Sequence, residues 1–171
     1  MTAKPFLVHL TDVLRTPGAQ HPLVLEGPVP GVGLSSAHVP EDALVALDAT
    51  IEAQGKTVVV QGTVRAPWEG ECRRCLEPAG GHLEVELREV FEADPVEGET
   101  YPIDGEQLDM GPVLRDVLAL ALPLAPLCRE DCPGPDPDAH PVVVEADEPE
   151  ATVPTPGDPR WAALDQLRFD S

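Results

Sequence analysis

Basic residues are scarce in this chain. Its 171 residues include 11 lysines and arginines against 31 aspartates and glutamates, which gives a formal net charge of −20. Nucleic-acid binding relies on lysine and arginine side chains that neutralise phosphates, so this balance disfavours a broad nucleic-acid-binding surface. An acidic surface attracts basic proteins, although the same charge can also serve solubility alone. The composition therefore favours a basic protein as the partner over RNA or DNA.

Long apolar runs are missing as well. No stretch approaches the ~20 consecutive apolar residues that a membrane-spanning helix requires. The apolar run around Phe6 is short, and Thr11, Asp12 and Arg15 follow it directly, so we expect no signal peptide. We therefore expect a cytoplasmic protein with no membrane partner. In that compartment thiols stay reduced, so cysteines there serve metal binding or redox chemistry more often than structural disulfides.

The common enzyme motifs do not occur. The chain has no P-loop, no glycine-rich dinucleotide fingerprint, no nucleophile elbow and no HExxH sequence. No two of its five histidines have the spacing of a metal-binding pair. Asp104 and Asp109 are neighbouring carboxylates, but a turn and a helix cap explain them without catalysis. We therefore expect a protein that is not an enzyme.

The chain has four cysteines, and they form two close pairs: Cys72 with Cys75, and Cys128 with Cys132. Each pair can supply two thiolates from one tight turn, which is what a tetrahedral Zn²⁺ site requires. We predict a structural zinc site, whose four thiolates leave no open position for catalysis. Two alternatives remain: a dithiol redox pair, or cysteines that serve as small apolar residues.

Three arginines flank the cysteine pairs: Arg73, Arg74 and Arg129. They can offset the negative charge of the thiolates, contact a partner or RNA, or be ordinary solvated side chains. Direct RNA binding by an acidic protein would need a local basic site. Such a site would require Arg65, Arg73, Arg74 and Arg88 to converge on one face.

Most of the chain before residue 100 has the pattern of strands. Apolar residues occupy every second position from Val45 to Ala53, a period of two that is typical of a half-buried strand. A turn at residues 55–56 and a β-branched segment at residues 57–64 predict the returning strand of a hairpin. Residues 83–91 alternate too, and the phase break at residues 90–91 suggests a bulge. Residues 6–10 and 23–25 predict short strands, and residues 27–40 a loop.

One principal helix is expected after Asp109, which has the character of an N-cap. Apolar residues then recur at helical spacing from Val113 to Ala121, and Pro123 and Pro126 end the helix. The helix would deliver the second cysteine pair to the first. The predicted fold class is α+β, a mainly antiparallel sheet with one principal helix.

The domain organisation follows from a change in composition. Residues 1–134 are predicted to form a single α+β domain. Residues 135–157 are rich in proline and acidic residues, which predicts a linker that forms no regular ladder. Residues 158–171 predict a short C-terminal helical segment, in which Trp161 could anchor a partner.

Residues 58–134 resemble the YceD family, bacterial and plastid proteins associated with the accumulation of large-subunit ribosomal RNA. The likeness is carried by residues 72–78 (CRRCLEP), the strand that follows, residues 103–110 (IDGEQLDM), the helix, residues 122–128 (LPLAPLC) and residues 132–134 (CPG). Residues 158–164 (DPRWAAL) are similar to the closing segment of the family. Many relatives have a further cysteine pair after the position of Gly134, and this chain does not. A metal site here depends on the four cysteines that remain, or it is lost.

The resemblance implies a role in ribosome biogenesis, in which large-subunit ribosomal RNA is kept processed or stable. In many bacteria the gene of the family lies beside that of a small basic ribosomal protein of the large subunit. We therefore expect a non-enzymatic factor that contacts a basic ribosomal protein or a ribosome-assembly intermediate. The alternatives are an RNA-binding processing factor that uses an arginine cluster and, less favoured, a thiol redox protein with a low-pKa cysteine.

Overall fold

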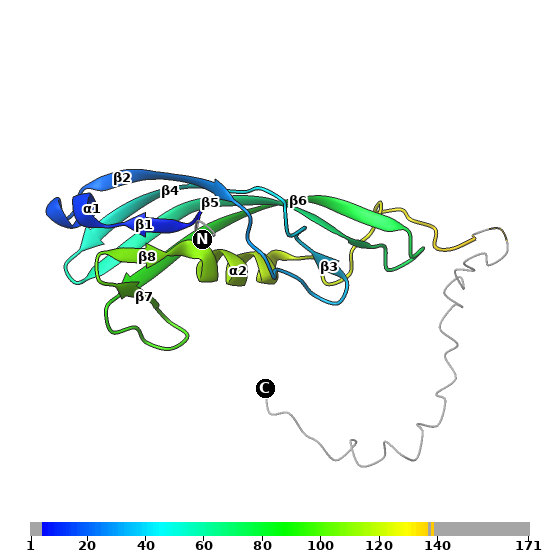
Figure 1. The fold of residues 1–171 in the computed structure, drawn as a ribbon. Coiled ribbons are helices and arrows are strands. Elements are labelled where there is room, and N and C mark those ends of the chain that lie inside the picture. Colours follow the sequence, from blue (N-terminus) through cyan, green and yellow to red (C-terminus); the bar gives the residue numbers. More distant parts are fainter. Residues whose placement is uncertain (1–4, 137, 139–171) are drawn as a thin grey trace, which may run out of the picture. The chain divides into compact units, whose positions relative to one another are not determined.

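The structure is a computed structural model that describes residues 5–136 and residue 138. This part of the chain forms eight strands and two helices (Figure 1). In chain order they are β1 (Leu7–His9), α1 (Thr11–Arg15), β2 (Gln20–Gly27), β3 (Ala37–His38), β4 (Val45–Gln54), β5 (Thr57–Glu71), β6 (Pro78–Glu92), β7 (Tyr101–Asp104), β8 (Gln107–Asp109) and α2 (Met110–Ala121).

The strands form one sheet in the order β1-β8-β7-β6-β5-β4-β2, and β3 pairs separately with β5. All pairs are antiparallel except β6 with β7. The sheet curls into a half-barrel, and α2 lies along it (Figure 1). Strands make up 46% of the described residues and helices 13%. The predicted α+β class is therefore wrong, because two strands of fifteen residues dominate a fold whose main helix has only twelve.

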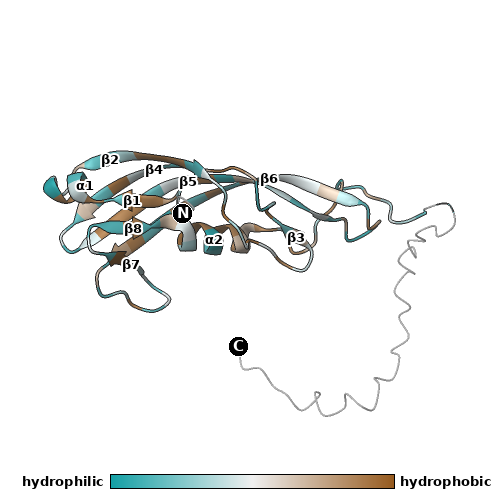
Figure 2. Ribbon diagram, viewed as in Figure 1, coloured by the Kyte–Doolittle hydropathy of each residue, from teal (hydrophilic) through white to brown (hydrophobic). Residues whose placement is uncertain are grey.

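The concave face of the sheet carries the hydrophobic core. The five alternating residues predicted to face inward on β4 are all buried: Val45, Leu47, Ala49, Ile51 and Ala53. Figure 2 shows the apolar stretches of the strands and of α2 in brown. The inward-facing side chains of a strand such as β4 are buried only when a second layer covers that face of the sheet. Helix α2 contributes to that layer.

Helix α2 begins as the sequence predicted. Asp109 is its N-cap, and the Asp109 Oδ1 atom accepts a hydrogen bond of 2.9 Å from the Gly111 N–H. The apolar side of the helix is buried through Val113, Leu114 and Leu118. The helix ends at Ala121, ahead of a proline that cannot continue it. The predicted principal helix is confirmed.

The hairpin of β5 and β6 is longer and more regular than predicted. Its pairing runs without interruption from Thr57 opposite Glu92 to Glu71 opposite Pro78. The predicted bulge near residue 90 is therefore wrong. Phe91 stays in phase and is completely buried, whereas Glu89 takes an inward-facing position of the same strand. Because the acidic Glu89 occupies an inward-facing position, the alternation in the sequence looks as if it shifts by one residue there.

The segment at residues 27–40, predicted as a loop, contributes to the core. It contains β3, and four of its side chains are buried: Val29, Val32, Ala37 and Val39. The strand before it, β2, extends well beyond the predicted residues 23–25.

Three sequence predictions fall on residues that the structure does not describe. They are most of the linker at residues 135–157, the helical segment at residues 158–171, and Trp161 within it. Neither of the two described helices has the length and apolar character needed to cross a membrane.

Candidate metal centre

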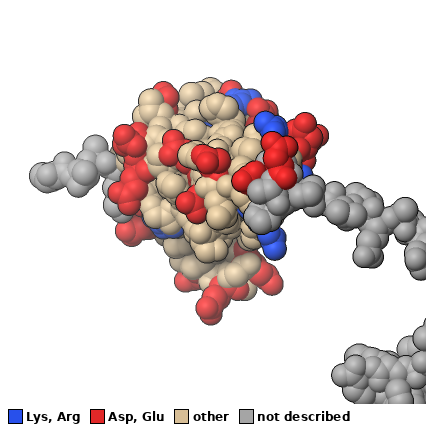
Figure 3. Space-filling view, turned by 90° about the vertical axis from the view of Figure 1, so that its right-hand side faces the viewer, with Lys and Arg blue, Asp and Glu red and all other residues tan. Residues whose placement is uncertain are grey.

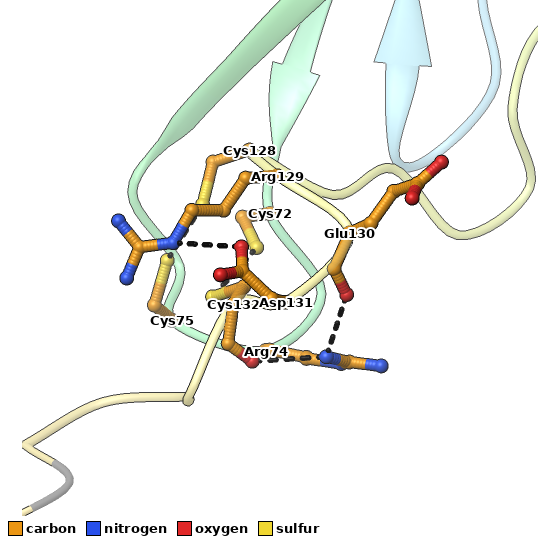
Figure 4. Close-up of polar contacts among 8 residues, drawn as sticks. All are labelled: Cys72, Arg74, Cys75, Cys128, Arg129, Glu130, Asp131 and Cys132. Atoms are coloured by element: carbon orange, nitrogen blue, oxygen red, sulfur yellow. Dashed lines mark hydrogen bonds and ion pairs between the residues drawn. The ribbon is translucent and has the colours of Figure 1, made fainter.

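The first cysteine pair lies in the turn that joins β5 to β6. The Cys72 N–H donates to the Glu77 carbonyl at 2.8 Å, and the Leu76 N–H donates to the Cys72 carbonyl at 2.9 Å. Leu76 has a φ of 64°, a left-handed conformation that non-glycine residues rarely adopt. These features reverse the chain tightly, so that the turn directs the thiols of Cys72 and Cys75 to the same side (Figure 4).

The second cysteine pair follows α2. The Pro126 carbonyl accepts a hydrogen bond of 2.8 Å from the Arg73 N–H, which docks the segment after the helix against the β5–β6 turn. The chain then turns again, with the Cys132 N–H donating to the Arg129 carbonyl at 3.2 Å. This second turn places Cys128 and Cys132 opposite the first pair (Figure 4).

The four sulfur atoms gather at one point, as the sequence predicted. The Cys72 Sγ lies 3.7 Å from the Cys132 Sγ, and the Cys75 Sγ lies 3.7 Å from the Cys128 Sγ. All four atoms lie within 4.8 Å of one another. A disulfide requires about 2.05 Å, and all four cysteines are free. Four sulfurs at about 2.3 Å from a central Zn²⁺ lie about 3.8 Å apart in a tetrahedron, so the set fits a metal ion of that size.

The pKa values of Cys72, Cys75 and Cys128 are shifted in different directions. The backbone N–H groups of Cys75, then Cys128, and more weakly Arg74, point at the Cys72 sulfur and lower its pKa to about 6. Hydrogen bonding with the Cys132 thiol, followed by burial, raises the pKa of Cys128 to about 12. The Glu77 N–H lowers the pKa of Cys75, but burial and the neighbouring thiols outweigh it and leave this pKa raised. The surroundings therefore favour a thiolate at Cys72, and a cation would help to deprotonate Cys75 and Cys128.

Arg74 joins the two turns. Its Nη1 atom donates to the Glu130 carbonyl at 3.1 Å and to the Cys132 carbonyl at 2.9 Å (Figure 4). The sequence analysis left three roles open for this arginine: charge compensation, contact with a partner or RNA, or an ordinary solvated side chain. The sequence pattern contains no signal for the carbonyl contacts. Arg74 thus acts as a positioning residue for the second turn.

The other two flanking arginines are exposed. The Arg129 Nε lies 3.3 Å from the Asp131 Oδ1 within the second turn. Arg73 contributes its backbone N–H to the docking of the helix segment, while its side chain is free to meet a partner. Figure 3 views this end of the molecule and shows acidic residues spread over the surface, with a few basic residues among them.

The four-arginine site that RNA binding would need does not form. The Arg65 Nε lies 3.1 Å from the Glu84 Oε2, and this pairing raises the pKa of Arg65 and lowers that of Glu84. Arg88 is opposite Gln61, ten residues along β6 from Pro78. At about 3.3 Å per residue it lies about 33 Å along the strand from the cysteine turn. Arg65 and Arg88 therefore do not join Arg73 and Arg74 in one basic site.

A redox role would need a reactive thiolate, and Cys72 has the low pKa. It is, however, completely buried. Thiol–disulfide exchange requires the attacking sulfur to reach a partner disulfide, and structural cysteines without access are inert. The N–H groups that lower the pKa of Cys72 equally suit a thiolate that binds a metal ion. Burial therefore favours metal binding over exchange.

Comparison with known proteins finds one family and several related sequences. The family described as large ribosomal RNA subunit accumulation protein YceD matches residues 60–168. An uncharacterised protein of Mycobacterium tuberculosis is 34% identical over 175 residues, which cover 96% of this chain and 82% of that protein. An uncharacterised protein of Mycobacterium leprae is 33% identical over 175 residues, covering 95% of this chain and 77% of its own length. No solved structure matches the chain significantly.

The family match takes in the cysteine turn of the hairpin, helix α2 and the second cysteine pair, and it spans more than half of the chain. The resemblance noted in the sequence is thereby confirmed: the chain belongs to the YceD family.

Proposed function

We propose that this protein is a non-enzymatic factor in the assembly of the large ribosomal subunit, and that it acts by binding a basic protein partner. The observation that carries the proposal is the family match, because the family is named for the accumulation of large-subunit ribosomal RNA. This role would place the protein in the cytoplasm, where the sequence analysis expects it.

The charge of the chain supports a protein partner over naked RNA. A net charge of −20 repels phosphates and attracts proteins that are rich in lysine and arginine. Ribosomal proteins that bind RNA have that character, and an acidic factor can shield them until they reach their RNA. The scattered positions of Arg65, Arg73, Arg74 and Arg88 also support this reading over the RNA-binding alternative.

We further propose that Cys72, Cys75, Cys128 and Cys132 hold a structural Zn²⁺. The sulfur distances fit a tetrahedral ion, and the donor set is the all-thiolate shell typical of structural zinc. Four protein ligands leave no position for a substrate or water. The ion would link the β5–β6 turn to the segment after α2, which is a structural task.

The test is capture of the full-length tagged protein from native lysate, with and without nuclease. We expect a basic large-subunit ribosomal protein or an assembly intermediate to remain bound after nuclease treatment. We also expect the complex to dissociate between about 0.1 M and 1 M salt, because surface charges attract each other through a screened field. Loss of all partners on nuclease treatment would contradict the proposal.

A second measurement separates the RNA-binding alternative. Binding of a purified ribosomal RNA fragment should be weak and should not change in Arg73→Ala, a variant that leaves the Arg74 contacts intact. Tight, salt-resistant binding to RNA that Arg73→Ala abolishes would favour the RNA-processing role instead.

A further inference from the structure

Strand β6 has one open edge. On one side it pairs with β5 over its whole length, from Pro78 to Glu92. On the other side β7 pairs only with Phe91 and Glu92, so that β7 lies beside one end of β6 (Figure 1). Within the described residues, no strand pairs with positions 79–89 along this second edge, and none of their backbone groups bonds to a loop or turn. Residues 79–89 of the strand are thus unpaired on one side.

The register shows which residues face the open edge. Cys72 and Glu77 form a hydrogen-bonded pair at the turn. Such pairs alternate along an antiparallel ladder, so the next pair, Glu71 with Pro78, is not hydrogen-bonded. The Glu71 N–H confirms this, because it donates to the Ser36 carbonyl on the opposite side, at 3.3 Å. The N–H and C=O groups of every even-numbered residue between 80 and 88 therefore point out of the sheet at the open edge.

The residues that carry these outward groups are exposed. All five even-numbered residues from Gly80 to Arg88 are exposed, and in Gly80 the exposed atoms are those of the backbone itself. An exposed row of unpaired N–H and C=O groups is a template for a further strand.

The other long edge of the sheet is less suited to this. Strand β2 is shorter than β6, and its even-numbered residues face outward by the same alternation. One of them is Pro22, which has no N–H to donate. Its edge therefore lacks a donor at the centre, whereas that of β6 is uninterrupted.

The side chains around the open edge are more acidic than basic, with Arg88 the one arginine among the five outward residues. Glu84 and Glu86 project from β6 on the convex face, and Glu84 forms an ion pair with Arg65. On the inner side, Glu89 is close enough to Asp116 of α2 for the aspartate charge to raise the pKa of Glu89, after the larger effect of burial. Leu120, four residues after Asp116 on the same side of α2, is 89% exposed. A strand added here would meet carboxylates on both faces.

We propose that an extended basic segment of a partner protein binds as an additional strand along β6, from Gly80 to Arg88. This inference rests on the proposed function, because it names the surface that the basic partner uses. Backbone hydrogen bonds to the even-numbered residues supply affinity, and the carboxylates on both sides select lysine and arginine over acidic side chains.

The test uses the full-length protein and a labelled peptide of about ten residues that alternates lysine with valine, a pattern that favours a strand. Binding is followed by fluorescence anisotropy, and amide hydrogen exchange is followed residue by residue. We expect the peptide to slow exchange at Gly80, His82, Glu84, Glu86 and Arg88. The odd-numbered amides between them already donate to β5, so we expect their exchange to stay unchanged.

Matched variants separate the backbone from the charge. Glu86→Pro removes an outward N–H without touching the β5 ladder, as Pro78 already does in the same strand, and should weaken peptide binding by at least about tenfold. Glu86→Gln removes only the charge and should weaken binding by about twofold to fivefold. Glu52→Gln removes an equal charge on β4, two strands away, and should leave binding unchanged. Two further peptides carry N-methyl groups on alternate amides, one on the odd and the other on the even positions. The peptide whose methyl groups replace the amide hydrogens that point at β6 should not bind. Unchanged exchange of the odd-numbered amides in Glu86→Pro confirms that the variant is folded.

Three outcomes would overturn the proposal. Equal peptide binding to wild type and Glu86→Pro, or new protection on β2 only, would show that the edge of β6 is not used. Protection of the even-numbered amides in the free protein would identify another occupant: a second copy if the protection grows with protein concentration, or a segment of the same chain if it does not. The peptide test does not depend on the lysate experiment. If wild type and Glu86→Pro capture a ribosomal protein equally, the proposed function stands and this inference fails. If the peptide binds β6 and no ribosomal protein is captured, this inference stands and the proposed function fails.

Discussion

The two halves of the β5–β6 hairpin are stabilised in different ways. One half, residues 57–66 with residues 83–92, belongs to the main hydrophobic core, and its residues 57–65 pair with β4; we call it the core half. The half beyond it, residues 67–71 with residues 78–82, pairs outside the hairpin only with the two residues of β3; we call it the tip half. Its buried cluster consists of Cys72, Ala79 and Cys132, with Trp68, Cys75 and Leu127 packed against them.

The difference shows how a long hairpin can extend beyond its sheet. Three buried residues remove little apolar surface from water, which is too little to hold two strands and a docked segment in place. In the tip half, the cysteine cluster takes the place of a larger hydrophobic core. We therefore expect the tip half to depend on metal and the core half to depend on packing.

The largest expected effect is that of metal removal. Structural zinc contributes an apparent binding energy of about 10–16 kcal/mol in zinc-finger peptides, and that energy is folding energy. Protein purified under reducing conditions should contain about one Zn²⁺ per chain, and Cys75→Ser should contain almost none. Amide exchange should then accelerate in the tip half and stay slow in the core half.

Ser35→Ala provides the control for this experiment, since it changes a side chain near the same end of the molecule without removing a sulfur ligand. Its metal content should equal that of the wild type. Full protection of the tip half in metal-free protein would refute the proposed dependence on metal.

The next effect concerns the core half. Phe91 is completely buried, and its ring contacts that of Tyr101 at a centroid distance of 5.7 Å. Phe91→Ala should lower the free energy of unfolding by about 3–5 kcal/mol, because it leaves a cavity in a packed core. Urea denaturation measures the loss, and metal analysis of the folded variant should show unchanged zinc content. Simultaneous loss of zinc would mean that the two halves unfold as one unit.

A smaller effect is expected for Arg74→Ala. The variant removes the two hydrogen bonds to the carbonyls of Glu130 and Cys132, and should destabilise the tip half by about 1 kcal/mol. Competition with a chelator measures the accompanying loss of metal affinity. Arg73→Ala is the matched control, because it removes the same charge from the neighbouring residue and none of these contacts. Equal behaviour of the two variants would assign the effect to charge alone.

The smallest effect is the pH response of Glu89 in the core half. Burial, followed by repulsion from Asp116, raises the pKa of Glu89 above its ordinary value in the folded state. The folded state therefore binds the proton more tightly than the unfolded state. Stability from this group is fully present below the unfolded pKa and is lost as the pH rises through the raised folded pKa. Glu89→Gln should be slightly more stable than wild type at neutral pH, and the difference should shrink on acidification. Parallel stability–pH curves would contradict this assignment.

The sequence predicted the elements whose patterns are local. The alternation of β4, the N-cap of Asp109 and the apolar side of α2 depend on neighbouring residues, and all are confirmed. The meeting of the four cysteines was predictable because each pair lies in its own turn and the helix between them has a definite end.

The length of the hairpin was not predictable by the same reasoning. Pro67 and Gly81 read as strand breakers. Pro67 is tolerated because β4 pairs with β5 only as far as Arg65, so that its missing N–H faces no partner strand. At Gly81, a Cβ atom would lie 2.9 Å from the Trp68 Nε1, so the glycine makes room for the indole ring. Both explanations are tertiary, so the strands predicted at residues 57–64 and 83–91 fall short of the hairpin that forms.

The separation of the cysteine pairs in the sequence has a consequence for the order of assembly. Cys75 and Cys128 are 53 residues apart, and Cys72 and Cys132 are 60 residues apart. Closing a loop of that size costs chain entropy that grows with the logarithm of its length, whereas Cys72 and Cys75 share one short turn. The first pair can therefore form early with its hairpin, and the second can join it only after α2 has docked on the sheet. Closure of the cluster would then mark the completion of the fold, and ligand exchange at the second pair would report the first step of unfolding, before any strand separates.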